Sequence, residues 1–230
     1  RRTWSEEMLE VCSLRKSQMA RVFESYEIVG TLKADLAQAL GLSPDVKVAA
    51  GAGDNAAAAV GTGTVGKGKC NISLGTSGTL FLSDDRYVEP MNHALHAFCH
   101  ADGGWHLLGC ELSAASCLSW WAELTEHGDL GAEQAAINPE KLGRNRVFFL
   151  PYLMGERTPH NDAEAAGAFI GMRMDTSRAD MTQAVLEGVA FGLRDGLEIA
   201  RSAGMTVTSS GLAGGGAKSP RSEERRVGQE

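Results

Sequence analysis

The sequence lacks the features that mark several protein classes. Its five cysteines form no Cys-x-x-Cys pair and are odd in number, which argues against a paired zinc site and a disulfide framework. We therefore expect reduced, partly buried thiols, as in a cytoplasmic protein. No apolar run approaches the length of a membrane span, and no signal peptide opens the chain. We expect no membrane partner.

Positive charge is also scarce. The formal net charge is −7, and no basic stripe interrupts it before the last ten residues, so nucleic acid is not expected as the main partner. Hydrophobic residues (43%) and charged residues (22%) are at the levels of an ordinary globular protein. The 230 residues allow one large domain or two small ones. Glycine is abundant, at 28 residues, which suits a fold that brings its backbone close to a ligand.

One glycine-rich stretch organises the chain. A short apolar strand, expected over 46–50, breaks at Gly51 and Gly53, and Asp54 then heads an alanine-rich helix expected over 55–60. An Asp at a helix start accepts hydrogen bonds from free backbone N–H groups, so the plain interpretation of Asp54 is a helix cap. The alternative is a catalytic base on a strand-to-helix turn, where glycines keep the space above it clear for a substrate.

Two further glycine turns follow expected strands. A strand over 70–74 leads into Gly75-Thr76-Ser77-Gly78, whose hydroxyls and backbone N–H groups suit an anion. A strand over 206–213 leads into Gly214-Gly215-Gly216-Ala217-Lys218. These turns favour the interpretation of Asp54 as a functional residue.

Three rival sites are weaker. Gly51-x-Gly53-x-x-Ala56 fits a loose dinucleotide fingerprint, but the acidic residue expected about twenty positions later is missing. Four histidines with one cysteine among them suggest a metal, yet a closed site needs convergent ligands, so structural histidines are expected. These residues are His93, His96, Cys99, His100 and His106. No nucleophile elbow with a Ser-His-Asp pattern is present.

Hydrophobic periodicity predicts a mixed α/β order. Helices are expected over 5–12, 15–24, 32–40, 111–127 and 177–203, the last opened by a Ser177-x-x-Asp180 capping box. Strands are expected over 46–50, 70–74, 79–83, 96–100, 105–108, 147–150 and 206–213, with an antiparallel meander from 70 to 108 and a tight turn at 27–30. The strand at 46–50 has no expected partner, which is typical of the end of a larger α/β domain. Gly188, Gly192 and Gly196 share one face of the last helix and are expected to serve close packing.

Several long motifs in order resemble the FGGY carbohydrate kinases, and among them most closely those that phosphorylate D-xylulose. The motifs include AGAGDNAAAAVG (50–61), SLGTSG (73–78), ELSAASCLSWWAELT (111–125) and FFLPYLMGERTPHND (148–162). The resemblance spans about residues 4–219. It implies an α/β fold of the actin/hexokinase-like (ribonuclease H-like) ATPase type, with two domains that are incomplete here.

The resemblance also implies roles for particular residues. Asp54 would be the base that takes the proton of the sugar hydroxyl, and Asn55 would help bind the sugar. Gly75, Thr76 and Ser77 would bind the nucleotide phosphates, and Gly214, Gly215, Gly216 and Ala217 the adenosine side. ATP and Mg²⁺ are the implied cofactors, no metal ligand is assigned, and a homodimer of the full-length parent is expected. Arg157, in the GERTPHND motif, is interpreted as a brace for its loop.

The expected organisation has three parts. Residues 1–66 would be the end of the first kinase domain, 67–219 a truncated nucleotide-binding domain, and 220–230 a charged tail atypical of the family. We expect such a fragment to be inactive alone. Two alternatives stay open: a kinase of another sugar or polyol, such as ribulose, gluconate or glycerol, or a non-catalytic nucleotide-binding member of the actin-like superfold.

Overall fold

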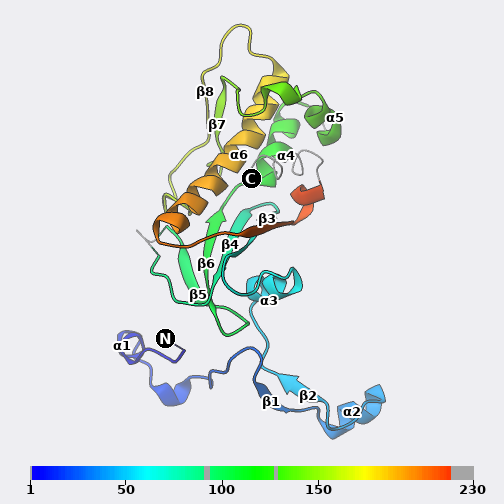
Figure 1. Ribbon diagram of the computed structural model, residues 1–230, viewed down its shortest axis with the longest axis vertical. Helices are drawn as coiled ribbons and strands as arrows, with labels where there is room; N and C mark the ends of the chain where they lie inside the picture. Colours follow the sequence, from blue (N-terminus) through cyan, green and yellow to red (C-terminus); the bar gives the residue numbers. More distant parts are fainter. Residues whose placement is uncertain (1, 91–93, 127–128, 219–230) are drawn as a thin grey trace.

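A five-stranded sheet with a long helix across one face forms the centre of the molecule (Figure 1). The structure, a computed structural model, describes residues 2–90, 94–126 and 129–218. The first elements of the chain lie at the lower end of the view, away from that sheet. The atypical tail expected at 220–230 lies outside the described residues.

The first sixty residues form short elements with little shared core. They are α1 (Glu6–Val11), η1 (Lys16–Gln18), β1 (Ile28–Thr31), α2 (Ala34–Leu40), β2 (Lys47–Ala49) and α3 (Asp54–Gly61). The helix expected over 15–24 is wrong, because only the single turn η1 forms there and Val22 remains 48% exposed. A short helix without packing partners is marginal in water. The turn expected at 27–30 is also wrong, because residues 28–30 lie in β1, which pairs antiparallel with β2 and gives that strand a partner.

The central sheet contains β3 (Lys69–Leu74), β4 (Gly78–Asp84), β5 (His96–Cys99), β6 (Trp105–Glu111) and β9 (Ser209–Ala213). Its strand order is β5-β6-β4-β3-β9, with β9 parallel to β3 and the other pairs antiparallel. The strands expected over 70–108 are confirmed, but the simple meander is wrong, because β6 and not β5 lies beside β4. The last expected strand of that group extends to Glu111, so the helix expected from 111 begins later.

The rest of the chain supplies helices and a small hairpin. These elements are α4 (Ala115–Leu124), α5 (Leu130–Ala135), η3 (Pro139–Lys141), β7 (Phe148–Leu150), β8 (Ala168–Ile170), α6 (Arg178–Ser202) and η4 (Gly215–Lys218). The capping box is confirmed: Ser177 Oγ accepts from the Asp180 N–H at 3.2 Å, and Asp180 Oδ2 accepts from the Ser177 N–H at 2.9 Å. It begins α6 at the predicted place.

Helix α6 contributes to both hydrophobic clusters. One cluster joins it to α4 and β7 through nine buried residues: Ala114, Cys117, Leu118, Trp121, Val147, Phe149, Ala184, Val185 and Val189. The other joins its C-terminal half to the sheet through Cys70, Leu80, Leu82, Leu95, Leu107, Ala200 and Met205. The predicted packing role of the helix glycines is confirmed. A Cβ on Gly188 would lie 2.3 Å from the Phe149 carbonyl oxygen, and one on Gly192 would lie 2.5 Å from a Glu111 carboxylate oxygen.

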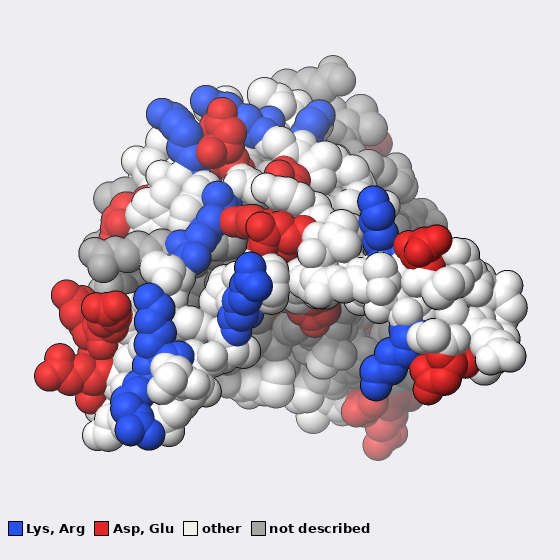
Figure 2. All heavy atoms as spheres, turned by 90° about the horizontal axis from the view of Figure 1, so that it is seen from below, with Lys and Arg blue, Asp and Glu red and all other residues white. Residues whose placement is uncertain are grey.

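The surface charges are mixed on the face seen from below. Figure 2 shows Lys and Arg interspersed with Asp and Glu there, and the described residues of that face form no continuous basic stripe. Within the described ranges, no helix combines the length and hydrophobicity needed to cross a bilayer.

Candidate functional site

The turn between β3 and β4 presents backbone N–H groups to one side. Its carbonyls are held from the other side by the start of α4: the Ala115 N–H donates to Gly75 O at 3.0 Å, and the Ala114 N–H donates to Thr76 O at 2.9 Å. The turn's peptide bonds are trans, and a trans N–H points opposite to the preceding C=O. The N–H groups of Thr76 and Ser77 therefore point away from α4, where an anion could accept from them.

The second glycine turn lies beside the first. Ser73 on β3 pairs with Ala213 on the parallel strand β9, so both strands end at the same edge of the sheet. Gly214 has φ +83°, and a Cβ there would lie 2.6 Å from the Leu74 carbonyl oxygen, so only glycine fits. Gly215 has open space around it, whereas a Cβ on Gly216 would lie 2.8 Å from Leu74 Cβ. The structure thus brings the predicted phosphate and adenosine turns together.

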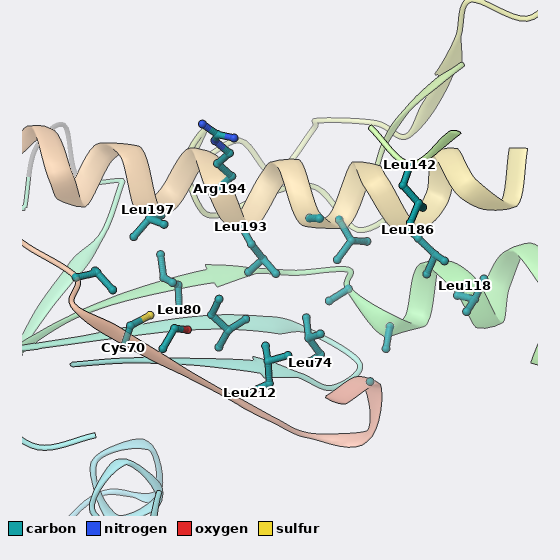
Figure 3. Close-up of a pocket in the computed structure, with 18 of the residues that line it drawn as sticks. Cys70, Leu74, Leu80, Leu118, Leu142, Leu186, Leu193, Arg194, Leu197 and Leu212 are labelled. Carbon is teal, nitrogen blue, oxygen red and sulfur yellow. The ribbon is translucent and has the colours of Figure 1, made fainter. Parts of the chain in front are cut away.

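An apolar cavity of about 820 Å³ adjoins the second turn. It lies between α6 and the sheet face formed by β3, β4 and β9, and Gly216 is among its lining residues. Figure 3 shows Leu193 and Leu197 of α6 pointing toward Leu80 and Leu212 of the sheet. Burial raises the pKa of the Cys70 thiol in this wall to about 11, so the thiol is neutral at physiological pH.

Asp54 is the first residue of α3 and is exposed, and Gly53 is the N-cap. The plain interpretation of Asp54 as the helix cap is therefore wrong, because Asp54 lies one residue after the N-cap. Its Oδ1 accepts from the Asn55 backbone N–H at 2.8 Å, while Oδ2 makes no hydrogen bond within the described part of the chain. A Cβ on Gly51 or Gly53 would meet nothing within 4 Å. One carboxylate oxygen of the exposed Asp54 is thus oriented by the backbone, and the space around Gly51 and Gly53 is open.

The structure does not join Asp54 to the glycine turns. No hydrogen bond or ion pair between described residues links Asp54 or Asn55 to either turn, and Figure 1 shows α3 below the sheet while η4 lies at the end of β9. The segment after α3 is tied to the sheet through Thr64, whose carbonyl oxygen lies 2.8 Å from His100 Nε2.

Two of the four histidines, His100 and His106, lie in the core of the sheet, whereas His96 is exposed. His100 is buried against Thr64, and His106 stacks on Phe81 with 4.1 Å between ring centroids. Burial lowers the pKa of His106 to about 4, which keeps it neutral near pH 7. Among the described residues, no three His, Cys, Asp or Glu side chains group closely enough to hold a metal ion. His93 lies outside the described residues.

Two buried carboxyl groups near the first turn were not identified from the sequence. Glu111 ends β6 and Glu156 lies in the GERTPHND loop; they are 2% and 1% exposed. Arg157 is exposed, and the loop is held instead by Thr158, which bonds the Cys110 N–H and the Ala94 carbonyl. Leu107, Gly109 and Glu111 alternate along the strand and all point inward, which could have indicated that Glu111 is buried. The expected helix from residue 111 ended the predicted strand too early for this alternation to be used.

Comparison with known proteins decides the family. The model of the C-terminal domain of the FGGY family of carbohydrate kinases matches residues 70–222, and that of the N-terminal domain matches residues 1–61. The chain belongs to the FGGY family of carbohydrate kinases. Its fold is accordingly the actin/hexokinase-like α/β fold that the motifs implied.

Individual members of the FGGY family match over nearly the whole chain. A xylulose kinase from Escherichia coli (strain K12) is 43% identical over 220 residues, which are 95% of this chain and 45% of the relative. A crystal structure from Brucella ovis, described as a "xyloylose kinase", superposes with a TM-score of 0.89 at 45% identity, covering 94% of this chain and 45% of that one. A gluconate kinase from Lactobacillus acidophilus superposes with a TM-score of 0.82 at 25% identity, covering 95% and 45%. This FGGY chain thus spans about 45% of the length of the relatives that it matches.

Proposed function

We propose that this chain is part of an ATP-dependent kinase that phosphorylates D-xylulose to D-xylulose 5-phosphate. The carrying observation is the pair of adjacent glycine turns at one edge of the sheet, one with two N–H groups pointing into the open and one where Gly214 and Gly216 leave no room for a side chain. This arrangement suits phosphates followed by a nucleoside. The 43% identical xylulose kinase of Escherichia coli supports the choice of sugar.

The proposed chemistry needs one proton acceptor and a phosphate cradle. Asp54 takes the proton of the terminal sugar hydroxyl, the hydroxyl oxygen forms a bond to the γ-phosphorus, and the bond to the β-phosphate oxygen breaks to release ADP. Gly75, Thr76 and Ser77 bind the phosphates. Asn55 contributes to sugar binding, and residues 214–217 lie on the adenosine side, beside the apolar cavity.

Mg²⁺ would accompany ATP and neutralise charge on its phosphates. The described residues include no grouping of three or more acidic, His or Cys side chains that could hold a metal ion by themselves. We therefore assign no step to a metal held by these residues.

The proposed organisation assigns residues 1–66 to the end of the first kinase domain and 67–219 to the second. Transfer then requires the two to close over the ligands, so that water is excluded and Asp54 meets the γ-phosphate. A cytoplasmic location and a homodimer of the full-length protein belong to the same proposal.

A full-length chimera tests the proposal. These residues replace the matching segment of the Escherichia coli xylulose kinase, and ADP release is measured with D-xylulose, D-ribulose, gluconate and glycerol. We expect release that depends on D-xylulose. Release that depends on gluconate would instead support the second candidate, for which the structural similarity to a gluconate kinase is the specific observation. ATP binding without release for any sugar would favour a non-catalytic nucleotide-binding protein.

A further inference from the structure

Glu111 lies directly under the phosphate turn. It is the last residue of β6 and pairs with Gly78, the first residue of β4 after the turn. A Cβ on Gly78 would lie 3.2 Å from Glu111 Oε2, and a Cβ on Gly192 would lie 2.5 Å from Oε1. The carboxyl group therefore fills the space between the start of β4 and helix α6. It fits there only because the residues facing it, Gly78 and Gly192, have no side chain.

The surroundings of Glu111 do not suit a charge. Neither of its carboxyl oxygens has a hydrogen-bond partner among the described residues, although the side chain is only 2% exposed. A buried carboxylate without donors is strongly disfavoured relative to its neutral form.

Glu156 is the contrasting neighbour. Its Oε1 accepts from the Leu112 N–H at 3.0 Å and from the Arg157 N–H at 2.7 Å, so it has two donors that stabilise a negative charge. Its Oε2, like both oxygens of Glu111, is buried without a partner. The two groups therefore differ in their ability to carry charge.

We propose that Glu111 is a positioning residue for the turn Gly75–Ser77, held as a neutral acid beside Glu156, whose Oε1 has two backbone donors. The neutral carboxyl keeps β4 and α6 in contact, and the segment after Glu111 then holds the turn's carbonyls through the N–H groups of Ala114 and Ala115. Ionisation of Glu111 would draw water into this layer and loosen the turn. The positioning role of Glu111 does not depend on the proposed function. Only the statement that the turn binds nucleotide phosphates rests on it.

The electrostatics agree with this geometry. Burial raises the pKa of Glu111 from 4.5 to about 9, and the negative charges of Glu156 and Asp195 add to the rise. Burial also raises the pKa of Glu156, while the N–H groups of Leu112 and Arg157 oppose it. The other titratable or charged groups around the pair are Cys110, Cys117, Tyr152, Arg157 and His160.

A pH dependence follows. The folded-state pKa of Glu111 is above its ordinary value, so its contribution to stability is complete below about pH 4.5 and is lost as pH rises toward about 9. Across that window the unfolding equilibrium constant rises by up to about tenfold per pH unit from this group.

Hydrogen–deuterium exchange of the 230-residue chain tests the proposal without ATP. Peptides covering 74–80 and 112–118 are followed from about pH 6 to about pH 10, corrected for intrinsic exchange, with a β5 peptide as the reference for global opening. The variants are Glu111→Gln, Glu111→Ala and, as an exposed control, Glu164→Gln.

We expect wild type and Glu164→Gln to lose up to about tenfold protection per pH unit in these two peptides between pH 6 and about pH 9, and more than in β5. Glu111→Gln should keep its protection at every pH, because the amide is neutral and of the same size. Glu111→Ala should lose protection already at pH 6. If Glu111→Gln follows the wild-type pH profile, the proposal is overturned. This comparison decides the question even if Glu111→Ala fails to fold.

In an active chimera, Glu111→Ala should raise KM for ATP, and Glu111→Gln should restore the wild-type KM. An inactive chimera would count against the proposed function alone.

Discussion

The two oxygens of Asp54 have different surroundings, and this division suits a general base. The backbone N–H of Asn55 holds Oδ1 at 2.8 Å, which orients the carboxylate without occupying Oδ2. Replacement by Asn keeps an acceptor for that bond but cannot take a proton. We expect Asp54→Asn in the full-length chimera to lower kcat by about 10²–10⁴-fold with ATP binding nearly unchanged.

Asp35 offers a matched control for this substitution, because it is also an acidic residue in the first turn of an N-terminal helix. Asp35→Asn should leave turnover unchanged. Turnover of Asp54→Asn within a few-fold of wild type would remove Asp54 from the proposed mechanism.

Gly215 separates binding from folding at the second turn. Nothing lies within 4 Å of a Cβ there, and its φ is not in the left-handed region, so a larger side chain can be accommodated without strain. Gly215→Val should therefore fold normally but weaken ATP binding by about tenfold or more, because the branched side chain occupies ligand space.

Gly75→Val should also weaken ATP binding, at the phosphates. Gly30→Val, in similarly open space on β1, is the control for titration calorimetry in the chimera. Wild-type affinity in a folded Gly215→Val variant would exclude this turn from the nucleotide site.

At the scale of elements, helix α6 allows the substitution of Gly by Ala to be compared at three positions that differ in how closely a neighbouring atom approaches. A Cβ at Gly188 would lie 2.3 Å from a backbone carbonyl oxygen, one at Gly192 2.5 Å from a carboxylate oxygen, and one at Gly196 3.2 Å from a methyl group. All three alanine variants gain similar helix propensity, about 1 kcal/mol. Gly188→Ala should still lose about 1–3 kcal/mol from overpacking, and Gly196→Ala should stay within about 1 kcal/mol of wild type. Urea unfolding checks the order, and equal losses at all three sites would contradict it.

The elements also show which features sequence patterns can predict. Local signals were sufficient for the capping box at Ser177, the strands of the sheet and the glycine turns, because each depends on neighbours within a few residues. The strand β1 was missed, since its four residues are all exposed and carry no burial pattern. The adjacency of β9 to β3 depends on a parallel pairing between Lys69 and Ser209 and the residues after them, which are far apart in the sequence, and no local pattern encodes it. Glu111 was missed because the helix boundary was placed four residues early.

For the whole molecule, the first sixty residues differ from the rest in burial. Few of their apolar side chains are buried, while most of the large ones on the β1–β2 sheet and α2 remain open to solvent, for example Ile28 at 54% and Leu40 at 59%. A surface of this kind suits a partner layer. We expect the 230-residue chain alone to show no D-xylulose-dependent ADP release and weak ATP binding at best, because closure over the ligands needs two domains. The full-length chimera is the control, and turnover by the isolated chain would show that it contains the complete catalytic machinery.

The parallel pairing of β9 with β3 has a consequence for the order of folding. Lys69 pairs with Ser209, and between them the chain forms three strands of the same sheet, the β7–β8 hairpin and helix α6. Contacts between residues so far apart in sequence close a large loop and therefore form slowly. On a ribosome, β3 and β4 emerge long before β9 and must wait with one edge unpaired. The turn at Gly75–Ser77 can thus form early, whereas the turn at Gly214–Gly216 can form beside it only after the last strand has joined the sheet.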